Sequence, residues 1–457
     1  MPLADIQTIV VVMLENRSFD HAVGYLSLAD TPLPVEGLRT DKAWLDPLAN
    51  EWNGTVYGIY RLDPATQQID DPAHDHNAIQ VQISAPPAAG APSRMGGFVQ
   101  SYVRFSDKPP ADPKLVMGYY DEVAVPVFDL FARQFAVCDH WFAALPTGTQ
   151  ANRLMAMSGE SALVDDARVL LPDQTLVYDW LAQRQIAWCV YAKLFPFFSM
   201  MPRWSGEIAT ALALSAAGGR GRFRLYDKFR AEWQGAYPVP QVIFIEPEYT
   251  NGPHLDAADD HPPTGIAKGQ AFLAEIYGVL TSNPARWANT MLIVTYDEHG
   301  GFFDHVPPLE IPTTAGGFPF ATTGVRVPAF VVSPHVAPGT VFSQPLDHTS
   351  ILQLLADRFA GGQDYSPAVA ARQAHLRPLS GILADAPVPR EPAPDLAEVA
   401  KVAGNLSPPP PPKGADLGDP PSAQAFRNAV IKIAGEHPDL AKSPGWQRLA
   451  AAIARVS

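Results

Sequence analysis

The chain has 457 residues, and its formal net charge at pH 7 is −14. This excess of acidic residues argues against nonspecific binding to nucleic acid or to an anionic membrane surface, so a phosphate-containing ligand would need a local site. A chain of this length can bury a large core without disulfides. We expect its two cysteines, Cys138 and Cys189, to be free thiols in that core.

No stretch of the sequence approaches the roughly 20 apolar residues that a transmembrane helix needs. Met1 is followed within a few residues by strand-like sequence, without the basic and apolar regions of a signal peptide. We therefore expect a soluble protein that is cytoplasmic as the sequence stands, and secreted or periplasmic if a signal was removed.

Apolar runs that are each followed by polar, Gly or Pro residues predict buried strands of a mainly parallel sheet. In chain order these strands are Ile9–Leu14, Ile186–Ala192, Val242–Ile245, Met291–Tyr296 and Val327–Ser333. Helix-like stretches lie between some of them, at Val127–Phe135, Gln174–Arg184, Gly269–Leu280 and Ser350–Phe359. The two kinds of segment predict a layered α/β fold, in which ligands bind beyond the carboxyl ends of the strands.

The composition predicts three parts of the chain. Residues 1–385 form one large folded domain, with an insertion around residues 160–240. Residues 386–422 are rich in proline, which is typical of an extended linker or of a strap along the surface. Residues 423–457 resemble two short amphipathic helices, which would form either a docked tail or a partner-binding element.

Two of the predicted strands end in acidic or amide residues. The first run is followed by Glu15 and Asn16, and the fourth by Asp297 and Glu298. Three carboxylates at one edge of a sheet would repel one another unless a cation neutralised them, and oxygen ligands of this kind favour a hard divalent ion. These residues therefore predict a metal site. The alternative is that each carboxylate caps a helix or pairs with an arginine such as Arg17.

The segment ALPTGTQANRLMAMSGES, residues 144–161, predicts a turn that leads into a helix beginning near Gln150. Thr147 or Thr149 would lie at the amino end of that helix, where unpaired backbone N–H groups stabilise an anion and lower the cost of forming an alkoxide. Contact with a metal would lower that cost further. One of these threonines is therefore a candidate nucleophile, and the alternative is a plain helix cap.

Histidines supply candidate proton donors. His74 and His76 lie in a polar loop, His261 follows two aspartates, and His348 precedes a predicted helix. Each could donate to a phosphoryl oxygen or protonate a leaving group, and each could instead be solvated or paired with a neighbouring Asp. Three other histidines lie near these motifs and could equally be structural groups that support the site, namely His21, His299 and His305.

The segments ENRSFDH, PTGTQANR, DDHP, DEHGGFFDHV and DHTSIL occur in this order along the chain. Together they resemble the phosphoesterase family that contains bacterial and plant phospholipases C and a group of acid phosphatases, over residues 6–360. The resemblance implies membership of the alkaline phosphatase superfamily. It also implies that superfamily's doubly wound α/β core, a mainly parallel sheet flanked by helices.

The resemblance further implies roles for individual residues. One divalent metal ion, Ca, Mg, Mn or Zn, would be bound by Glu15, Asn16, Asp297 and Glu298. Thr149 would be the nucleophile and form a phosphothreonine, and His261 or His348 would protonate the departing alkoxide. The substrate-binding residues would be His74, Asn152 and Arg153, with His261 also contacting phosphate. The sequence departs from the family pattern at Ala151, usually a proline, and has no histidine between Arg153 and His254 for a further phosphate contact.

The predicted function is metal-dependent hydrolysis of a phosphodiester lipid, as in a phospholipase C, and the alternative is an acid phosphatase acting on phosphomonoesters. The expected partner is a phosphate ester or phospholipid substrate. The stretch LFPFFSMMPRW, residues 194–204, would either line an acyl-accepting cleft or belong to the core. Two further alternatives are a non-catalytic phosphate-binding scaffold and a phosphotransferase. A sulfatase is not expected, because neither cysteine lies in a C-x-P-x-R setting.

Overall fold

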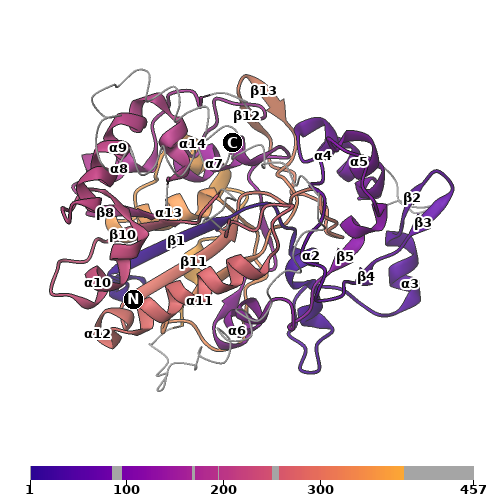
Figure 1. Cartoon of the computed structure of the whole chain (residues 1–457), viewed down its shortest axis with the longest axis horizontal. Coiled ribbons are helices and arrows are strands. Elements are labelled where there is room, and N and C mark those ends of the chain that lie inside the picture. Colours follow the sequence, from indigo (N-terminus) through magenta and orange to yellow (C-terminus); the bar gives the residue numbers. More distant parts are fainter. Residues whose placement is uncertain (1, 85–94, 167–169, 194, 250–256, 385–457) are drawn as a thin grey trace.

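The computed structural model describes residues 2–84, 95–166, 170–193, 195–249 and 257–384. Its core is an eight-stranded sheet (Figure 1) with the strand order β15 (Thr340–Val341), β6 (Ala136–Val137), β14 (Ala329–Val332), β11 (Thr290–Tyr296), β1 (Thr8–Leu14), β10 (Val242–Glu246), β8 (Trp188–Ala192) and β9 (Phe223–Leu225). Strand β14 is antiparallel to β11 and β6. The other neighbouring strands of this sheet are parallel, which confirms the predicted mainly parallel sheet.

Strand β1 lies at the centre of the sheet, where both of its faces are covered. Its sequence TIVVVML is rich in β-branched residues, and all of its residues except Met13 are buried. Strand β11 pairs with it as far as Leu14 and Tyr296, and β10 pairs along its other edge as far as Val12 and Ile245. The three strands therefore end at one edge of the sheet.

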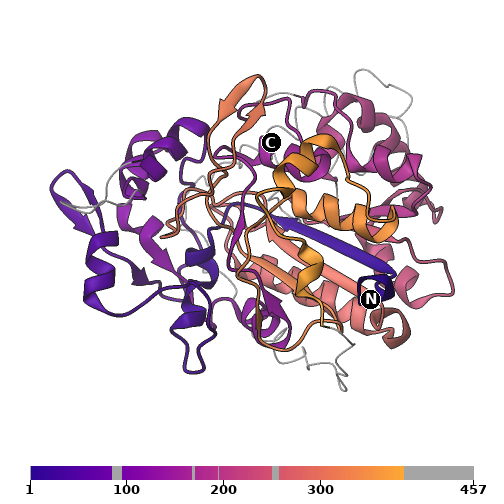
Figure 2. The ribbon, with the colours of Figure 1, turned by 180° about the vertical axis from the view of Figure 1, so that it is seen from behind.

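Helices cover both faces of this sheet. Helices α6 (Pro126–Gln134) and α11 (Ala267–Thr281) contact each other in front of the sheet in Figure 1. Helices α7 (Thr149–Ser158) and α13 (Thr349–Phe359) contact each other on the opposite face, and α13 lies in front of the sheet in Figure 2. This arrangement confirms the predicted doubly wound core.

Smaller elements extend the domain beyond this core. A second lobe, on the right of Figure 1, contains α2 (Phe19–Val23), α3 (Lys42–Leu45), β2 (Asn50–Trp52), β3 (Thr55–Tyr57), β4 (Tyr60–Arg61), α4 (His76–Ser84), α5 (Phe98–Phe105) and β5 (Gly118–Tyr119). The remaining helices and strands are α1 (Pro2–Asp5), β7 (Trp141–Phe142), α8 (Val177–Gln183), α9 (Pro202–Ala216), α10 (Phe229–Gln234), α12 (Pro284–Trp287), β12 (Thr313–Ala315), β13 (Phe318–Phe320), β16 (Leu346–Asp347) and α14 (Pro367–Gln373). Short 3-10 turns complete the chain, for example Phe197–Met200.

Each of the five predicted strands and four predicted helices is present, with shifted ends. The strand predicted from Ile186 begins at Trp188, after Gln185 turns with a positive φ of 55°. The strand predicted from Val327 begins at Ala329, because Pro328 has no N–H group for the ladder. The stretch around residues 160–240, expected as an insertion, supplies β8 and β9 to the central sheet.

Two predicted parts, the linker at residues 386–422 and the tail at residues 423–457, lie outside the described residues. Within the described ranges, no helix has both the length and the apolar character needed to cross a membrane. Cys138 and Cys189 are buried and free, as predicted.

Candidate active site

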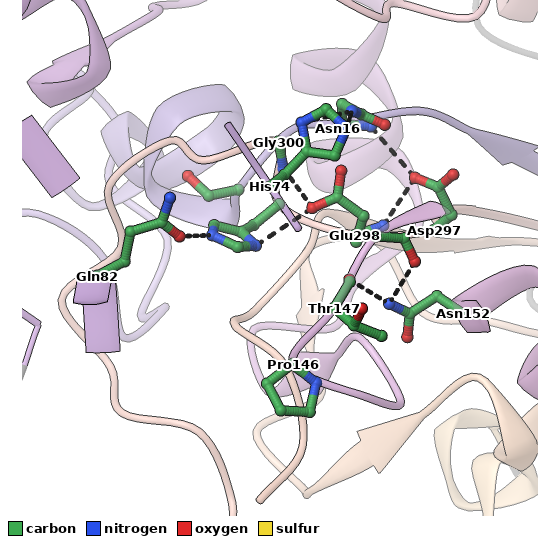
Figure 3. Close-up of polar contacts among 12 residues, drawn as sticks. Asn16, His74, Gln82, Pro146, Thr147, Asn152, Asp297, Glu298 and Gly300 are labelled. Atoms are coloured by element: carbon green, nitrogen blue, oxygen red, sulfur yellow. Dashed lines mark hydrogen bonds and ion pairs between the residues drawn. The ribbon is translucent and has the colours of Figure 1, made fainter. Parts of the chain in front are cut away.

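The ends of β1 and β11 bring the four predicted metal ligands to one rim, and Figure 3 labels three of them, Asn16, Asp297 and Glu298. The side chains of Glu15, Asn16, Asp297 and Glu298 are all fully buried. Asn16 has a positive φ of 61°. A Cβ atom on Gly300 would lie 2.3 Å from the carbonyl oxygen of Asn16, so the rim depends on a backbone approach that only glycine permits.

Hydrogen bonds to backbone groups hold this rim. Asp297 Oδ1 accepts the N–H groups of Asn16 at 3.2 Å and Glu298 at 2.7 Å. Glu298 Oε2 accepts the Gly300 N–H at 2.7 Å, whereas Glu298 Oε1 has no hydrogen-bond partner among the described residues. Some carboxylate oxygens of the rim therefore accept backbone hydrogen bonds, and Glu298 Oε1 has none among the described residues.

Arg153 reaches the underside of the rim from α7. Its Nε donates to Asp297 Oδ2 at 3.2 Å, and one of its terminal nitrogens lies 3.1 Å from Glu15 Oε1. Its other terminal nitrogen donates to the Tyr249 hydroxyl at 3.0 Å, and the side chain is buried. The sequence placed Arg153 among the substrate-binding residues, but the structure places it as the counter-ion of two rim carboxylates.

The two candidate threonines differ in what they face. Thr149 is the first residue of α7, and its hydroxyl donates to Asn16 Oδ1 at 3.3 Å. The Thr147 hydroxyl donates instead to Asp165 Oδ1 at 2.9 Å. Thr149 is therefore the threonine whose hydroxyl meets the rim.

Asn152 shapes the turn that precedes α7. Its side-chain nitrogen donates to the carbonyl oxygens of Leu145 at 3.1 Å, Thr147 at 2.8 Å and Gly148 at 3.2 Å. Its side-chain oxygen accepts the Leu145 N–H at 2.9 Å. Asn152 was expected to contact phosphate, but in the structure its polar atoms hold the loop that presents Thr149.

His74 and His261 lie together beside the rim, with ring centroids 5.6 Å apart. A ring nitrogen of His74, Nε2, lies 3.2 Å from the Asn16 side-chain nitrogen. Burial lowers the pKa of His74, but the carboxylates of Glu298 and Asp71 outweigh it and raise this pKa to about 10. Burial and, second, the neighbouring charge of His74 lower the pKa of His261 to about 3. At neutral pH the site therefore pairs a protonated His74 with a neutral His261.

His348 lies beneath the rim and is fully buried. Its Nε2 donates to the Asp297 carbonyl oxygen at 2.6 Å, and its Nδ1 accepts the Trp141 indole N–H at 3.2 Å. Both ring nitrogens are thus engaged within the fold, one with Asp297 and one with Trp141, so the structure favours a positioning role for His348 over that of a proton donor.

The other histidines have structural contacts. His76 Nδ1 donates to the Pro146 carbonyl oxygen at 2.9 Å. His21 Nδ1 donates to the Gly118 carbonyl oxygen, His299 Nε2 to Gln82 and His305 Nδ1 to Asp20, at 2.7, 2.8 and 2.6 Å. Of the two alternatives for His21, His299 and His305, these contacts favour the structural one.

Several buried carboxylate oxygens at the site lack a hydrogen-bond partner within the part of the chain that the structure describes. They are Oε2 of Glu15, Oε1 of Glu298 and Oδ2 of Asp259, whereas Glu15 Oε1 forms an ion pair with Arg153 at 3.1 Å. Burial raises the pKa of Glu298 to about 8, and it raises the pKa values of Glu15 and Asp259 well above their usual range. Unpartnered buried oxygens of this kind fit a hard divalent cation, which would supply the missing positive charge.

The side chains do not converge as a closed metal site. Among the described residues, the groups of three potential ligands whose atoms lie within 4.8 Å of one another are Asp71, His74 and His261, and Asp20, Asp304 and His305. The carboxylates of Glu15, Asp297 and Glu298 do not form such a group. Since Arg153 contacts two of them, the predicted ligand set lies at one rim and stays a prediction.

Sequence reasoning missed two carboxylates of the site, Asp71 and Asp259. Asp71 lies three residues before the candidate His74, and Asp259 is the first residue of the DDHP motif that contains the candidate His261. This closeness in sequence was the signal that could have identified them.

The aromatic stretch at residues 195–204 is largely core, with Phe197, Phe198 and Met200 buried. Its possible role as a lining of an acyl cleft is therefore not supported.

Comparisons with known proteins place the chain in a family. The profile of the Phosphoesterase family matches residues 6–360. Non-specific phospholipase C3 of Arabidopsis thaliana is 32% identical over 362 residues, which cover 74% of this chain and 65% of that protein. Phospholipase C A of Mycobacterium tuberculosis is 28% identical over 404 residues, which cover 78% of this chain and 73% of that protein. The chain thus spans slightly less than two thirds of the plant relative's length.

Among solved structures, a protein of the alkaline phosphatase superfamily from Vibrio parahaemolyticus is similar at 11% identity over 51% of this chain and 60% of that chain. Its TM-score of 0.31 is too low to carry an inference. The family profile covers most of the chain, including both ends of the rim and the loop that holds Thr149. The chain belongs to the Phosphoesterase family.

Proposed function

We propose that the chain is a metal-dependent phosphoesterase that cleaves phosphodiester lipids in the manner of a phospholipase C, through a phosphothreonine on Thr149. The observation that carries this proposal is the contact between the Thr149 hydroxyl and Asn16 at a rim where, among the described residues, several buried carboxylate oxygens have no hydrogen-bond partner. The printed names of the relatives, non-specific phospholipase C3 and phospholipase C A, favour a diester lipid over a phosphomonoester.

The position of Thr149 suits a nucleophile. As the first residue of α7, it lies where backbone N–H groups and the positive end of the helix dipole favour a negatively charged oxygen. The Asn152 side chain fixes the preceding turn, so the hydroxyl is held before substrate binds.

The metal would be held by Glu15, Asn16, Asp297 and Glu298, with Asp259 as a further carboxylate within the same rim. When bound, a divalent ion there would offset the carboxylate charge and stabilise negative charge on the phosphoryl oxygens. Arg153 already offsets part of this charge, since it contacts both Glu15 and Asp297. His348 supports the rim as a positioning residue through the Asp297 carbonyl oxygen.

His74 is the proposed proton donor. It is protonated at neutral pH because its pKa is about 10, whereas His261, with a pKa of about 3, is neutral and suited to hydrogen bonding with a phosphoryl oxygen. The Thr149 oxygen forms a bond to phosphorus and the bond from phosphorus to the glycerol oxygen breaks, with net transfer of the Thr149 proton to that oxygen. Water then cleaves the phosphothreonine.

The test compares hydrolysis of p-nitrophenylphosphorylcholine with that of p-nitrophenyl phosphate, after chelation and after each divalent metal is added back. We expect faster cleavage of the diester, only with metal present. Rapid quenching followed by mass spectrometry of the peptide that contains Thr149 should detect a phosphocholine adduct on that residue.

Three results would change the proposal. Faster cleavage of the monoester would make the protein a phosphatase. Full activity after exhaustive chelation would remove the metal from the mechanism. No turnover of either substrate with any metal would favour a non-catalytic phosphate-binding protein.

A further inference from the structure

A groove opens between the β12–β13 hairpin and one face of α4, which it follows from His76 to Ser84. Its volume is ≈ 460 Å³, which falls in the range of small-molecule binding pockets. In Figures 1 and 2 the hairpin projects at the top of the molecule, close to α4 and α7. The groove is lined in part by His76, Ile83, Pro146, Pro307, Phe318 and Phe320.

The groove adjoins the rim through two short chain connections. Pro146 lines the groove and lies three residues before Thr149, a span of at most about 11 Å. His76 also lines the groove and lies two residues after His74, a span of at most about 7 Å. His76 Nδ1 donates to the Pro146 carbonyl oxygen at 2.9 Å, which ties the two connections together. The groove therefore lies within about 11 Å of Thr149 along the chain, which is within reach of an acylated glycerol attached to the reacting phosphorus.

The chemistry of the lining indicates an uncharged, partly apolar ligand. Among the described residues that line it, none is Asp, Glu, Lys or Arg, whereas prolines and two phenylalanines are present. Phe318 exposes 40% of its surface, which is unusual for a side chain of its size. Hydroxyl and amide groups of Thr322 and Gln80 also line the groove and could hydrogen-bond to ester oxygens.

The walls of the groove are held to the same loop that supports α7. The rings of Phe318 and Phe320 lie edge-on to His76, with centroids 5.1 and 5.0 Å away. Asp165 accepts both the His76 N–H at 2.8 Å and the Thr147 hydroxyl at 2.9 Å. The hairpin, α4 and the Thr149 loop therefore form one connected structure.

We propose that this groove binds the acylated glycerol portion of the phospholipid, with Phe318 contacting the acyl chains. This inference rests on the proposed function, because it concerns the leaving group of the same reaction. Aromatic rings can also bind a quaternary ammonium group, so the choline headgroup is the alternative ligand, and a substrate that carries choline without acyl chains separates the two cases.

The test compares dihexanoyl phosphatidylcholine, used as monomers, with p-nitrophenylphosphorylcholine, which lacks acyl chains. Phe318→Ala removes the exposed ring, and Ala321→Trp fills the groove from another wall residue. We expect each variant to lower kcat/KM about tenfold for dihexanoyl phosphatidylcholine and less than about twofold for p-nitrophenylphosphorylcholine. Phe105→Ala is the matched control, because Phe105 is 37% exposed on α5 and does not line the groove.

The inference is overturned if the two substrates lose activity equally in both variants, or if neither variant affects the lipid. A second measurement separates its failure from that of the proposed function. Thr149→Ala protein is titrated with monomeric dihexanoyl phosphatidylcholine by calorimetry, with and without Phe318→Ala. If wild type cleaves neither substrate but binding weakens about tenfold with Phe318→Ala, the groove assignment stands and the catalytic proposal fails. Binding that is absent or independent of Phe318 overturns the groove assignment.

Discussion

Arg153 and Arg326 are both buried among carboxylates, but the two clusters differ in how fully their oxygens are engaged. In the Arg326 cluster, Nε donates to Asp304 at 2.9 Å and a terminal nitrogen donates to Asp20 at 3.1 Å. The second oxygen of Asp20 accepts from the His305 ring at 2.6 Å, and the second oxygen of Asp304 accepts the Asp20 N–H at 3.1 Å. In the Arg153 cluster, Glu15 and neighbouring carboxylates keep unpartnered oxygens within the described residues.

We interpret the Arg326 cluster as a structural ion cluster and the Arg153 cluster as the part of the proposed site that would receive a charged partner. Full engagement lets buried charges stabilise the fold, whereas an unpartnered buried oxygen costs free energy unless something else binds it. The Arg326 cluster links α2 to the segment between β13 and β14, and each of its carboxylate oxygens named above has a hydrogen-bond partner. The Arg153 cluster leaves free energy to be gained on binding, which is the property expected of a metal and phosphate site.

The largest expected effect comes from Thr149→Ala, beside the Arg153 cluster. Because the proposed nucleophile is removed, kcat/KM for p-nitrophenylphosphorylcholine should fall by roughly 10^4-fold or more. The urea midpoint should change little, because the lost hydroxyl makes one long hydrogen bond of 3.3 Å. Thr147→Ala is the control and should lose far less activity. A Thr149→Ala protein that retains wild-type turnover would contradict the assignment.

The next largest effect is a loss of stability when the Arg326 cluster is broken. Arg326→Met leaves Asp20 and Asp304 buried without their counter-ion, so the free energy of unfolding should fall by about 3–5 kcal/mol. Urea unfolding measures this loss. Arg104→Met, at an exposed arginine of α5, should change it by less than about 0.5 kcal/mol. If the two substitutions lowered the free energy of unfolding equally, the idea that the Arg326 cluster stabilises the fold would be wrong.

A smaller effect concerns pH in the metal-free protein. The folded-state pKa of Glu298 is about 8 because of burial, against 4.5 ordinarily, so its contribution to stability is present below pH 4.5 and is lost as pH rises toward 8. Glu298→Gln should remove about 3 kcal/mol of the decline in unfolding free energy between pH 5 and pH 8 in chelator. A divalent ion should reduce the wild-type decline. An identical decline in both proteins would show that Glu298 does not titrate in this range.

The smallest effect concerns His305, whose ring contacts Asp20 in the Arg326 cluster. Although burial alone lowers the pKa of His305, Asp20 raises it above the usual value, so its contribution to stability is present below about pH 6.5 and is lost as pH rises through the raised value. His305→Gln should therefore cost about 1 kcal/mol at pH 6 and less at pH 9, with or without divalent metal. His375→Gln, at an exposed histidine, serves as the control. If the stability lost in His305→Gln depended on divalent metal, the Arg326 cluster would also respond to metal, and the distinction between the two clusters would be wrong.

The sequence was informative wherever a local pattern decided the structure. The apolar runs predicted β1 and β11, and the residues just after them predicted that Glu15 and Asp297 would meet at one edge, because parallel strands end together. The small residues before α7 predicted a helix start close to Thr149.

Side-chain direction was not predictable from these patterns. Arg153 and Asn152 follow Thr149 within one turn of helix, so the motif suggested that they share its ligand. In the structure they contact the strand ends and the preceding loop, which depends on how α7 lies against the sheet. The same holds for His348, which meets Asp297 only because α13 begins beside β11. Contacts of this kind are set by tertiary packing.

The central position of β1 also governs how the chain reaches its native state. The Asn16 amide and the Asp297 carboxylate that it binds are separated by 281 positions, and both neighbours of β1 come late in the chain. Such distant pairing is slow to form, because much loop closure must precede it. During synthesis, β1 therefore emerges with both edges unpaired and stays so until β10 and β11 arrive. An apolar strand in that condition is a template for aggregation, so a nascent chain of this protein would benefit from a chaperone until the sheet closes.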